Sequence, residues 1–358
     1  MSGLKVWMLT PLFFPVKGGT EVHVYNLSKQ LVRQSVEVQV HTTRDTYTQR
    51  GALSESEIID GIRIVRHSRT WSFGDSPSVL HFHKLGRRRS LWNLYTIYFL
   101  LLDLRSRGVP TLMTSHASLV TSWGALYYLQ RAMARRLSAL IAVSEWEREQ
   151  MIKRGFPATK IRVVPNGVEE EAFTLPPRRI QTDRPFLLFL ARFFRIKRQD
   201  MAIRALRKVS GVDLVLAGQV HDVGYFNELK ALVKSLGLED RVKFMLDVDQ
   251  ATKYALLDSC TALILTSEVE AEGLVVKEAM ARGKPVIARN KTVFPYLIGK
   301  ENGFLVSDED ELANAIDTLL SSQELAKRIG EANLAKAKQW RWEIIAKRIL
   351  EIYREVGA

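Results

Sequence analysis

The fold of this chain is decided by the stretch Ser267-Glu-Val-Glu-Ala-Glu-Gly-Leu-Val-Val-Lys-Glu-Ala-Met-Ala-Arg-Gly-Lys-Pro-Val-Ile-Ala288. An apolar run at 262–265 leads into it and predicts a buried strand. Gly273 permits a close turn, and apolar residues at helical spacing follow it. Gly283 suits the left-handed position just past a helix, and Pro285 prevents the helix from continuing. The stretch therefore predicts strand, acidic loop, helix, tight turn and strand, which together form one βαβ unit.

Two carboxylates of this stretch, Glu270 and Glu278, are separated by seven residues. In open α/β sheets, ligands bind at the carboxyl ends of strands and against helix N-termini. A pair of carboxylates at that edge could bind the hydroxyl groups of one long ligand. The simpler interpretation is that acidic residues favour the positive end of a helix. That interpretation suits Glu268, Glu270 and Glu272 better than it suits Glu278, and spacing alone leaves both open.

The pattern Glu270-x7-Glu278, followed by Ala-Met-Ala-Arg-Gly-Lys-Pro-Val, resembles the signature of retaining glycosyltransferases of family four, the glycosyl transferases group 1. This resemblance implies the α/β fold called GT-B, in which two Rossmann-like, doubly wound parallel-sheet domains face each other across a cleft. It also implies that Glu270 contacts the donor sugar and that Glu278 holds the ribose of the nucleotide. Gly273, Leu274 and Val275, at the start of the helix, are further expected donor-binding residues.

Length and composition agree with a two-domain globular protein, since 358 residues with 46% hydrophobic and 25% charged residues can build two cores. We expect an N-terminal acceptor-binding domain over residues 1–174, completed by a C-terminal helix at 340–358 that crosses back onto it. Residues 175–339 are expected to bind the nucleotide-sugar. Cys260 is the only cysteine, which excludes an internal disulfide and favours a reducing compartment.

The net charge of +13 is concentrated in the first half of the chain. Residues 1–174 carry 23 basic against 14 acidic residues, whereas residues 175–339 carry 25 against 22. This asymmetry favours a negatively charged partner, such as a phospholipid surface, a phosphorylated acceptor or nucleic acid. The basic run Lys84–Arg89 precedes the apolar segment Leu91–Leu104, which reads as a buried crossover helix in preference to an interfacial membrane helix. No signal peptide or membrane span is expected, so we expect a cytoplasmic location, with peripheral attachment to the inner face of the membrane as an open alternative.

Near the N-terminus, Gly18 and Gly19 come directly before an amphipathic helix expected over Thr20–Gln34, whose first residue, Thr20, can cap it. Adjacent glycines allow backbone N–H groups to point at an anion, although a plain tight turn explains the pair equally well. The sequence of this loop resembles that of the N-terminal loop of family four, which closes over the donor phosphates and the acceptor. The resemblance therefore makes Gly18 and Gly19 donor-binding residues.

Three histidines accompany two of the expected strands. His81 and His83 share one face of the strand at 79–82, but a metal site needs further ligands and none is evident nearby, so no metal is expected. His116 follows the strand at 111–114, at the carboxyl end that faces the ligand crevice. From the residues alone, a structural and a functional role are equally good interpretations of His116. It matches the Thr-x-His motif of family four, whose histidine reaches the donor sugar.

Arg192 and Lys197 lie at the carboxyl end of the first strand of the expected second domain. Arginine can bind phosphate oxygens in a bidentate manner and lysine supplies a point charge, although ordinary surface charge is the alternative. The spacing matches the pair that binds the donor diphosphate in family four, where glycines usually stand at the positions of Ala191 and Arg198. Gly218, at the end of the next strand, is expected near the nucleotide.

One departure from the family pattern follows the strand that ends at Ala288. The family commonly has a Gly-Gly pair and then Pro-Glu, whereas this chain has Thr292-Val293 and then Pro295-Tyr296. Because β-branched residues restrict the backbone, we expect this loop to make fewer backbone contacts to the donor than the usual loop. The departure leaves the identity of the donor open.

The sequence therefore predicts a hexosyltransferase that moves a sugar from a nucleotide diphosphate-sugar donor to a phosphorylated, lipid-linked or sugar acceptor, without cofactor or metal. As the resemblance implies, transfer would proceed with retention of configuration. The expected catalytic residues are His116, Arg192, Lys197 and Glu270. An inactive sugar-nucleotide-binding protein is one alternative. A basic nucleic-acid-binding module is another, although no nucleic-acid-binding motif is present and no nucleic acid is expected as a partner.

Overall fold

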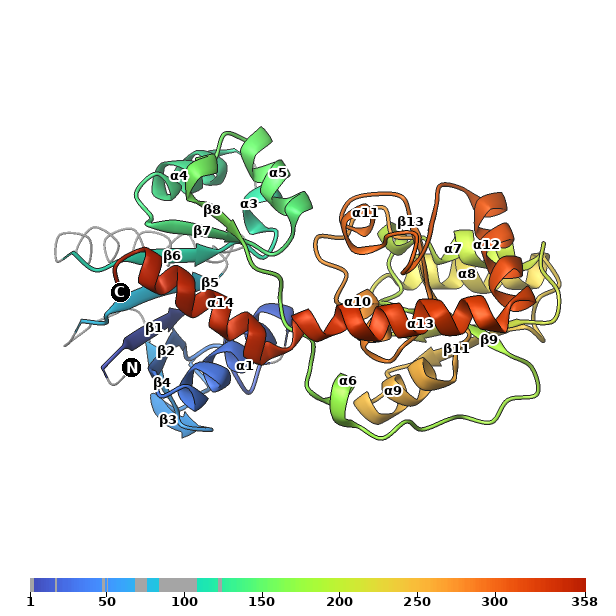
Figure 1. Cartoon of the computed structure of the whole chain (residues 1–358), viewed down its shortest axis with the longest axis horizontal. Coiled ribbons are helices and arrows are strands. Elements are labelled where there is room, and N and C mark those ends of the chain that lie inside the picture. The colour runs from blue at the N-terminus through green and yellow to red at the C-terminus, as the bar shows by residue number, and fades with distance from the viewer. Residues whose placement is uncertain are drawn as a thin grey trace. The chain divides into compact units, whose positions relative to one another are not determined.

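The computed structural model describes residues 3–16, 18–46, 49, 51–67, 76–83, 108–121 and 124–358. The chain divides into two compact units (Figure 1). Unit 1 comprises the chain up to Gly167 together with Trp342–Ala358, and unit 2 comprises Val168–Arg341. Each unit contains a largely parallel β-sheet with helices packed on it, so the prediction of two parallel-sheet α/β domains is confirmed.

The sheet of unit 1 has the strand order β3-β4-β2-β1-β5-β6-β7-β8. Its strands pair in parallel except for β3, which is antiparallel to β4. The strands are β1 (Lys5–Leu9), β2 (Glu37–Thr43), β3 (Ser56–Ile59), β4 (Ile62–His67), β5 (Val79–His83), β6 (Thr111–Thr114), β7 (Ala139–Ala142) and β8 (Ile161–Val163). The helices are α1 (Gly19–Arg33), α3 (Ser118–Thr121), α4 (Ala125–Ala134), α5 (Glu145–Lys153) and α14 (Trp342–Glu355), with a short 3-10 turn at Ala158–Lys160.

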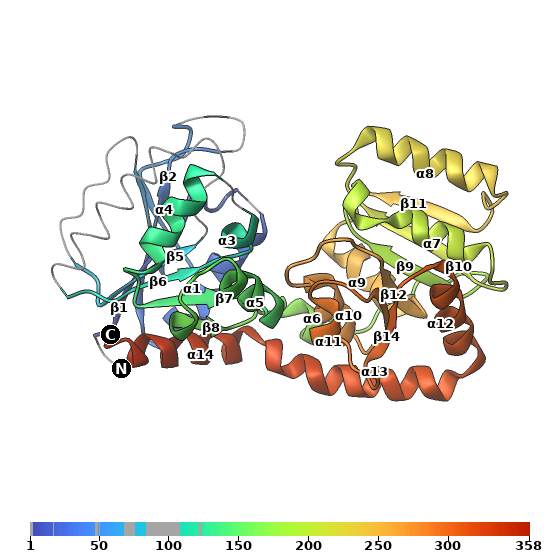
Figure 2. The same cartoon turned by 90° about the horizontal axis from the view of Figure 1, so that it is seen from above.

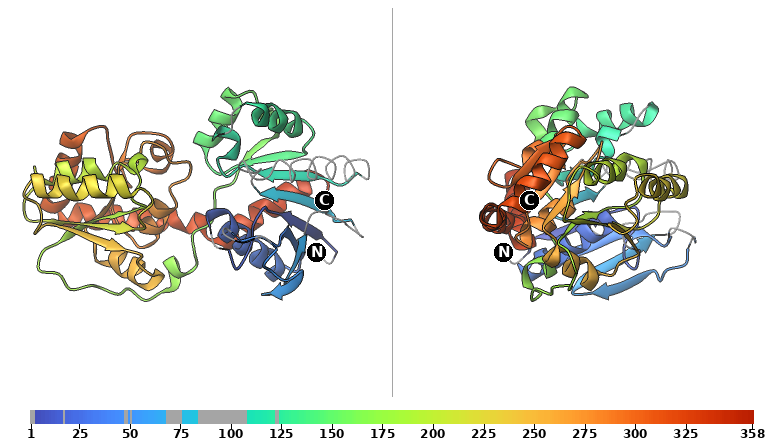
Figure 3. Two further views of the ribbon diagram at one scale, coloured as in Figure 1. Left: turned by 180° about the vertical axis from the view of Figure 1, so that it is seen from behind. Right: turned by 90° about the vertical axis from the view of Figure 1, so that its right-hand side faces the viewer.

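Strand β1 shows why this sheet is covered on both faces. Alternate residues of a strand point to opposite faces. Val6 and Met8 belong to a core that α1 and α14 help to build, whereas Trp7 and Leu9 belong to a second core with residues of α3, α4 and α5. The view from behind shows the red helix α14 beside the blue helix α1 (Figure 3). The end of the chain is therefore part of the first core of unit 1.

The sheet of unit 2 is parallel throughout, with the strand order β11-β10-β9-β12-β13-β14. The strands are β9 (Phe186–Leu190), β10 (Asp213–Gly218), β11 (Val242–Leu246), β12 (Ala262–Leu265), β13 (Val286–Arg289) and β14 (Gly303–Val306). The helices are α6 (Glu171–Thr174), α7 (Gln199–Leu206), α8 (Val223–Ser235), α9 (Gln250–Ser259), α10 (Leu274–Ala281), α11 (Phe294–Leu297), α12 (Glu309–Ser321) and α13 (Gln323–Ala337), with 3-10 turns at Arg195–Lys197 and Lys338–Trp340. Helix α7 packs against both α8 and α12 (Figure 2).

The βαβ unit predicted from the opening stretch is confirmed as β12, α10 and β13. Gly273 and Gly283 bracket the helix, and both have the positive φ angles that favour glycine, +69° and +67°.

The units divide at Gly167 and Arg341, whereas the sequence placed the boundaries at residues 174 and 339. The physical reason is that the segment after Gly167 is bound to unit 2. The Val168 N–H donates to the Trp340 carbonyl over 2.8 Å, and Val168 also forms a parallel bridge with Arg341. The Arg282 guanidinium donates to the carbonyl of Leu175 over 2.8 Å. Helix α6 therefore belongs to unit 2.

Among the described residues, no helix is both long enough and apolar enough to cross a membrane. The expected basic run Lys84–Arg89 and the apolar segment Leu91–Leu104 lie outside the described residues.

Candidate active site

In unit 2, Lys197 and Glu270 meet at one edge of the sheet. Strands β9 and β12 are parallel neighbours, so the segments that follow them start at the same edge. The Lys197 ammonium donates to Oε2 of Glu270 over 2.5 Å, and both side chains are largely shielded from solvent. The sequence placed each residue after a strand but did not predict that they pair directly.

Arg192 follows the same strand as Lys197. Its side chain is exposed, and its guanidinium forms no ion pair with any residue in the described part of the chain. The Arg192 carbonyl accepts a hydrogen bond from the Gln199 side-chain amide over 3.0 Å, which fixes the backbone at this position. Arg192 and Lys197 therefore supply a solvent-facing guanidinium and a paired ammonium after one strand.

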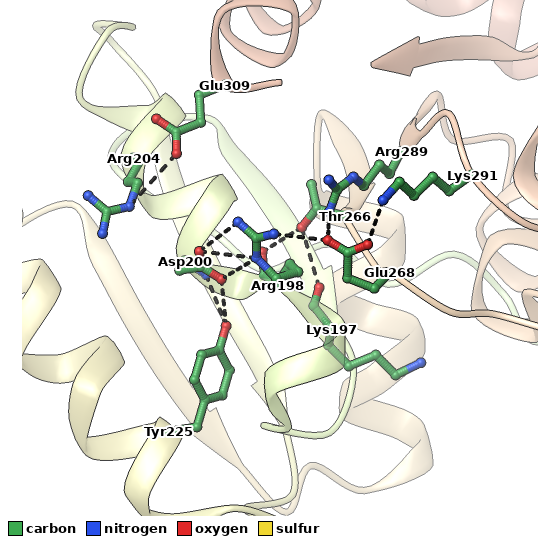
Figure 4. A network of polar contacts seen from close by, with 10 residues as sticks. All are labelled: Lys197, Arg198, Asp200, Arg204, Tyr225, Thr266, Glu268, Arg289, Lys291 and Glu309. Carbon is green, nitrogen blue, oxygen red and sulfur yellow. Dashed lines mark hydrogen bonds and ion pairs between the residues drawn. The ribbon is translucent and has the colours of Figure 1, made fainter. Parts of the chain in front are cut away.

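A network around Glu268 holds the Lys197 segment against the segment after β12 (Figure 4). The Glu268 carboxylate accepts from Arg198 over 3.0 Å and from Lys291 over 2.7 Å, and Arg289 also donates to it. The hydrogen bond from Lys291 and the adjacent charge of Arg289 lower the pKa of Glu268 to about 2. Because Glu268 contacts cations from two segments, it links the ends of β9 and β13.

Backbone contacts reinforce this link. The Glu268 N–H donates to the carbonyl of Ile196 over 2.8 Å, and the Thr266 hydroxyl donates to the carbonyl of Arg198 over 2.6 Å. In Figure 4 the Lys197 side chain extends away from the network, although its carbonyl also faces Thr266. The network therefore fixes the backbone and leaves the ammonium directed toward Glu270.

The structure accounts for the departure from glycine at Arg198. Arg198 has a left-handed backbone with φ +56°, a conformation in which glycine has no steric cost. Its side chain offsets that cost by pairing with Asp200 over 3.0 Å and with Glu268. At the other position, the Ala191 backbone lies close to Gly218. A Cβ on Gly218 would lie 2.0 Å from the Ala191 carbonyl oxygen, so close backbone approach requires Gly218.

Glu278, on α10, is buried and carries a partner that the sequence did not predict. The Lys253 ammonium, from α9, donates to Glu278 over 2.7 Å and to Glu169 over 3.2 Å. Burial raises the pKa of Glu278, and the Lys253 charge opposes that shift. For Lys253, burial opposes the charged form, but the carboxylates of Glu278 and Glu169 prevail and its pKa is raised. Glu278 is therefore held in one position before any ligand binds.

Gly273, Leu274 and Val275 form the start of α10, as expected. The first N–H groups of a helix have no acceptor within the helix, and the helix dipole favours an anion there. Gly273 has φ +69°, and a Cβ at this position would lie 2.9 Å from the Leu297 side chain. No side chain caps this helix, since the N-cap position is Gly273 itself.

The segment that departs from the family pattern contacts Glu270 directly. The Glu270 N–H donates to the Thr292 hydroxyl over 3.2 Å, and Thr292 has a left-handed backbone with φ +52°. Val293 is completely buried, whereas Tyr296 is 43% exposed. The hydroxyl of Thr292 therefore contacts the residue expected to bind the donor sugar.

In unit 1, α1 begins one residue earlier than predicted. Gly18 occupies the N-cap position with an extended backbone, Gly19 is the first helical residue, and Thr20 lies inside the first turn. The expectation that Thr20 caps the helix was wrong, because Gly18 occupies the N-cap position and makes no side-chain cap hydrogen bond. A Cβ on Gly19 would meet no atom within 4 Å, so packing does not require glycine there.

His116 follows β6 as predicted and has a left-handed backbone with φ +46°. Ala117 is also left-handed, with φ +63°, and two such residues in succession are held by a buried carboxylate. Glu147 accepts from the Ala117 N–H over 2.5 Å and from the Val143 N–H over 2.7 Å. Local strain of this kind often accompanies functional sites. The sequence did not identify Glu147, because its partner Ala117 comes from a loop that is distant in sequence.

Two further histidines surround His116. Nδ1 of His83 lies 3.3 Å from Nε2 of His116, and the ring of His23, on α1, lies 4.6 Å from the His116 ring. His83 is fully buried, and burial holds its pKa well below the usual range. His81 has a different environment, bonded to Tyr353 over 2.7 Å and to Thr114 over 2.8 Å. The fold thus brings His23 and His116 to His83, although no further ligand was evident near His83 in the sequence.

Comparisons with known proteins agree with a fold of two parallel-sheet units. The family model described as Glycosyltransferase Family 4 matches residues 17–172, and the model described as Glycosyl transferases group 1 matches residues 172–336. The chain belongs to this family of glycosyltransferases and has the GT-B fold. It is an enzyme of the glycosyltransferase class.

Two curated relatives span nearly the whole chain. The GDP-mannose-dependent alpha-(1-6)-phosphatidylinositol monomannoside mannosyltransferase of Mycobacterium tuberculosis is 26% identical, over 98% of each chain. The phosphatidyl-myo-inositol mannosyltransferase of Mycobacterium leprae is 27% identical, over 99% of this chain and 97% of its own. Among solved structures, the sucrose-phosphate synthase of Thermosynechococcus elongatus superimposes with a TM-score of 0.77 at 20% identity, over 99% of each chain.

Proposed function

We propose that this glycosyltransferase moves a hexose from a nucleoside diphosphate-sugar to an acceptor of the inositol phosphate class, with retention of the anomeric configuration. The observation that carries the proposal is the meeting of Lys197 and Glu270 after two neighbouring parallel strands, with Arg192 exposed after the same strand as Lys197. This edge offers cations for a diphosphate and a carboxylate for sugar hydroxyls.

The difficult step is departure of the nucleoside diphosphate. As the bond between the sugar C1 and the β-phosphate oxygen breaks, negative charge grows on that phosphate. The largely shielded Lys197 and the exposed Arg192 stabilise this charge by donating hydrogen bonds to the phosphate oxygens. An acceptor hydroxyl forms the new bond to C1 on the same face, and its proton passes to the departing phosphate oxygen. No metal takes part in this scheme.

The remaining site residues orient the donor. Glu270 binds hydroxyl groups of the sugar, and Glu278 binds the ribose from the position that Lys253 holds. The N–H groups at the start of α10 and α1 bind phosphate oxygens. His116 contributes a ring nitrogen toward the donor sugar.

The acceptor class is supported by charge and by relatives. The basic first half of the chain favours a negatively charged acceptor. Two relatives are named for transfer to phosphatidylinositol compounds, and others are named D-inositol 3-phosphate glycosyltransferases. Phosphorylated inositol is the chemistry that these acceptors share. If the acceptor is a lipid, the enzyme would attach peripherally to an anionic membrane to reach it.

The test is a matrix of donors and acceptors with the purified full chain. GDP-mannose, UDP-glucose and UDP-N-acetylglucosamine are each combined with myo-inositol 1-phosphate, myo-inositol 3-phosphate, vesicles containing phosphatidylinositol, and no acceptor. Mass spectrometry identifies the product, and the one-bond carbon–proton coupling at C1, measured by NMR, reports the anomeric configuration. Addition of EDTA should not lower the activity.

The arms separate the alternatives. Product with a free inositol phosphate and product in the vesicles distinguish the two sources of acceptor. A donor that raises the melting temperature without turnover under any condition supports the inactive sugar-nucleotide-binding protein instead, since a ligand at 100 times its Kd adds about 2.7 kcal/mol. Inversion at C1 would contradict the retaining mechanism.

A further inference from the structure

Three imidazoles from separate elements of unit 1 converge at one point. His23 comes from α1, His83 from the end of β5 and His116 from the segment after β6. Each offers a ring nitrogen, and these three atoms all lie within 4.8 Å of one another. It is the one group of this kind within the described residues. Its members are far apart in the chain, so folding alone assembles it.

The distances suit a small coordination sphere. Zn–N bonds of about 2.0–2.1 Å at tetrahedral angles place two ligand nitrogens about 3.4 Å apart. Nδ1 of His83 and Nε2 of His116 are 3.3 Å apart, which matches one edge of such a tetrahedron. The His23 ring lies 4.6 Å from the His116 ring and 5.2 Å from the His83 ring, centroid to centroid. The three ring nitrogens lie within 4.8 Å of one another, so a bound cation would draw the His23 nitrogen closer to the other two.

The donor set and its surroundings select the kind of cation. Three neutral imidazoles suit Zn²⁺ and its neighbours in the first transition row, whereas Mg²⁺ and Ca²⁺ prefer oxygen ligands. His23 and His83 are buried, so their rings are held by packing, while His116 is half-buried and gives a path from solvent. With Nδ1 of His83 on the metal, its Nε2 faces the Met8 sulfur at 3.3 Å, which restrains the ring from behind.

We propose that His23, His83 and His116 form a three-nitrogen binding site for one divalent cation of the Zn²⁺ class, and that a bound cation inhibits transfer by occupying the ring nitrogen of His116. The inhibitory part rests on the proposed role of His116 toward the donor sugar, whereas the binding part does not. The fourth position of the cation is completed by water.

The binding test uses the full chain without an affinity tag and with Co²⁺ as the probe. Co²⁺ in a tetrahedral nitrogen site has visible absorption bands, and Zn²⁺ should displace it, whereas a large excess of Mg²⁺ or Ca²⁺ should not. Equilibrium dialysis with metal analysis should give one Zn²⁺ per chain. Absence of stoichiometric binding, or displacement by Mg²⁺, would overturn the site.

Variants assign the ligands. His116→Ala, in a half-buried segment, and His23→Gln, in α1, should each weaken Zn²⁺ binding by at least about 100-fold, since loss of an outer-shell partner alone costs 10–100-fold. His67→Asn is the matched control, because His67 lies 2.9 Å from His41 in the same unit but outside the three-histidine group. Unchanged affinity in His116→Ala, or equal weakening in His67→Asn, would overturn the assignment. Circular dichroism verifies that each variant is folded.

The inhibition test is separate. Wild-type transfer should fall with Zn²⁺ in parallel with occupancy of the site and recover fully with EDTA. Inhibition without stoichiometric binding would overturn the proposed mechanism of inhibition. Binding with full activity would overturn the inhibitory part and argue against His116 in the transfer, while the metal site would stand. Failure of transfer under all conditions affects the proposed function alone, because binding is measured without substrates.

Discussion

Lys197 and Glu270 form an ion pair with an Nζ···Oε2 distance of 2.5 Å, which joins the segment after β9 to the segment after β12. An ammonium has three donors, so Lys197 can contact Glu270 and a phosphate oxygen at the same time. The pair therefore couples the group expected on the diphosphate to the group expected on the sugar, at the two ends of the bond that breaks.

Replacement of Lys197 by alanine should lower the turnover number by roughly 10²–10³-fold, on the scale of one lost donor to a developing charge. The fold should persist, because the Glu268 network holds the same segment through other residues. Steady-state kinetics with the best donor gives the turnover number, and a thermal melt reports folding.

Lys208→Ala is the matched control for this variant. Lys208 is an exposed lysine of the same unit and is also paired with a carboxylate, that of Asp310, over 2.5 Å. It should keep wild-type kinetics. A Lys197→Ala enzyme within a few-fold of wild type would remove Lys197 from the phosphate site.

The parts of the site that follow from local chemistry could be predicted from sequence. Glycines with positive φ bracket α10, and Asp249 caps α9 by accepting from the Thr252 N–H over 2.7 Å, as its position before that helix predicts. The edge of the sheet that carries Lys197 and Glu270 also followed from strand periodicity, because parallel strands end at one edge.

The partners of these residues could not be predicted, because tertiary packing selects them. Lys253 looks like an ordinary helical surface lysine in the sequence, but the packing of α9 brings it to Glu278. Glu147 and His23 are likewise brought to the His116 segment by elements that are distant in sequence. No local pattern marks a residue whose partner lies on another element.

Replacement of Glu278 by glutamine should weaken nucleotide binding roughly 10- to 100-fold, because a hydrogen bond to a charged group contributes about 1.5–3 kcal/mol. The ribose contact exists before and after the chemistry, so affinity should change more than the turnover number does. Calorimetric titration with the nucleoside diphosphate measures the effect.

Glu331→Gln, an exposed change on α13, serves as the control for Glu278→Gln. Lys253→Met should reproduce part of the loss, since it removes the ammonium that positions Glu278. If Glu278→Gln binds the nucleotide as tightly as wild type does, the ribose role is wrong.

Replacement of Thr292 by glycine should alter donor preference or turnover while changing stability by no more than about 1 kcal/mol. Glycine relieves the left-handed strain at this position, which is on the order of 1–2 kcal/mol, and removes the hydroxyl that contacts the Glu270 N–H. Thr292→Ala isolates the hydroxyl, because it keeps the strain. The rate of transfer from each of a panel of donors, and the melting temperature, are measured for each variant.

The buried neighbour Val293 should not be changed together with Thr292. A double variant in which Val293 is also changed to glycine would not isolate the effect on the donor. Val293 is completely buried, so its truncation should cost at least about 2 kcal/mol and obscure any effect on the donor. The single Thr292 variants are therefore the sharper test. Unchanged preference and rate in Thr292→Gly would show that the loop acts independently of the donor.

The stability of the chain should decrease as the pH falls from 7 to 5, in part because of a buried histidine pair in unit 1. Burial and the neighbouring His67 lower the pKa of His41 to about 3, and burial lowers that of His67 to about 4. An unfolded histidine has a pKa of about 6.5, so the unfolded chain binds more protons in this range. The contribution of these histidines to the free energy of unfolding is therefore fully present above pH 7 and is lost as the pH falls. His41 alone accounts for a loss of about 2 kcal/mol between pH 7 and pH 5.

His41→Asn removes that titration. The variant should be less stable at pH 7, because His41 packs on Trp7 with ring centroids 4.6 Å apart, but its stability should depend less steeply on pH. Urea unfolding followed by circular dichroism at pH 7, 6 and 5 gives the slope for both proteins, and His221→Asn controls for loss of one histidine in unit 2. An equally steep decrease in His41→Asn would mean that other groups control the acid sensitivity. A flatter slope would show that His41, which remains uncharged in the folded state, causes part of the acid sensitivity.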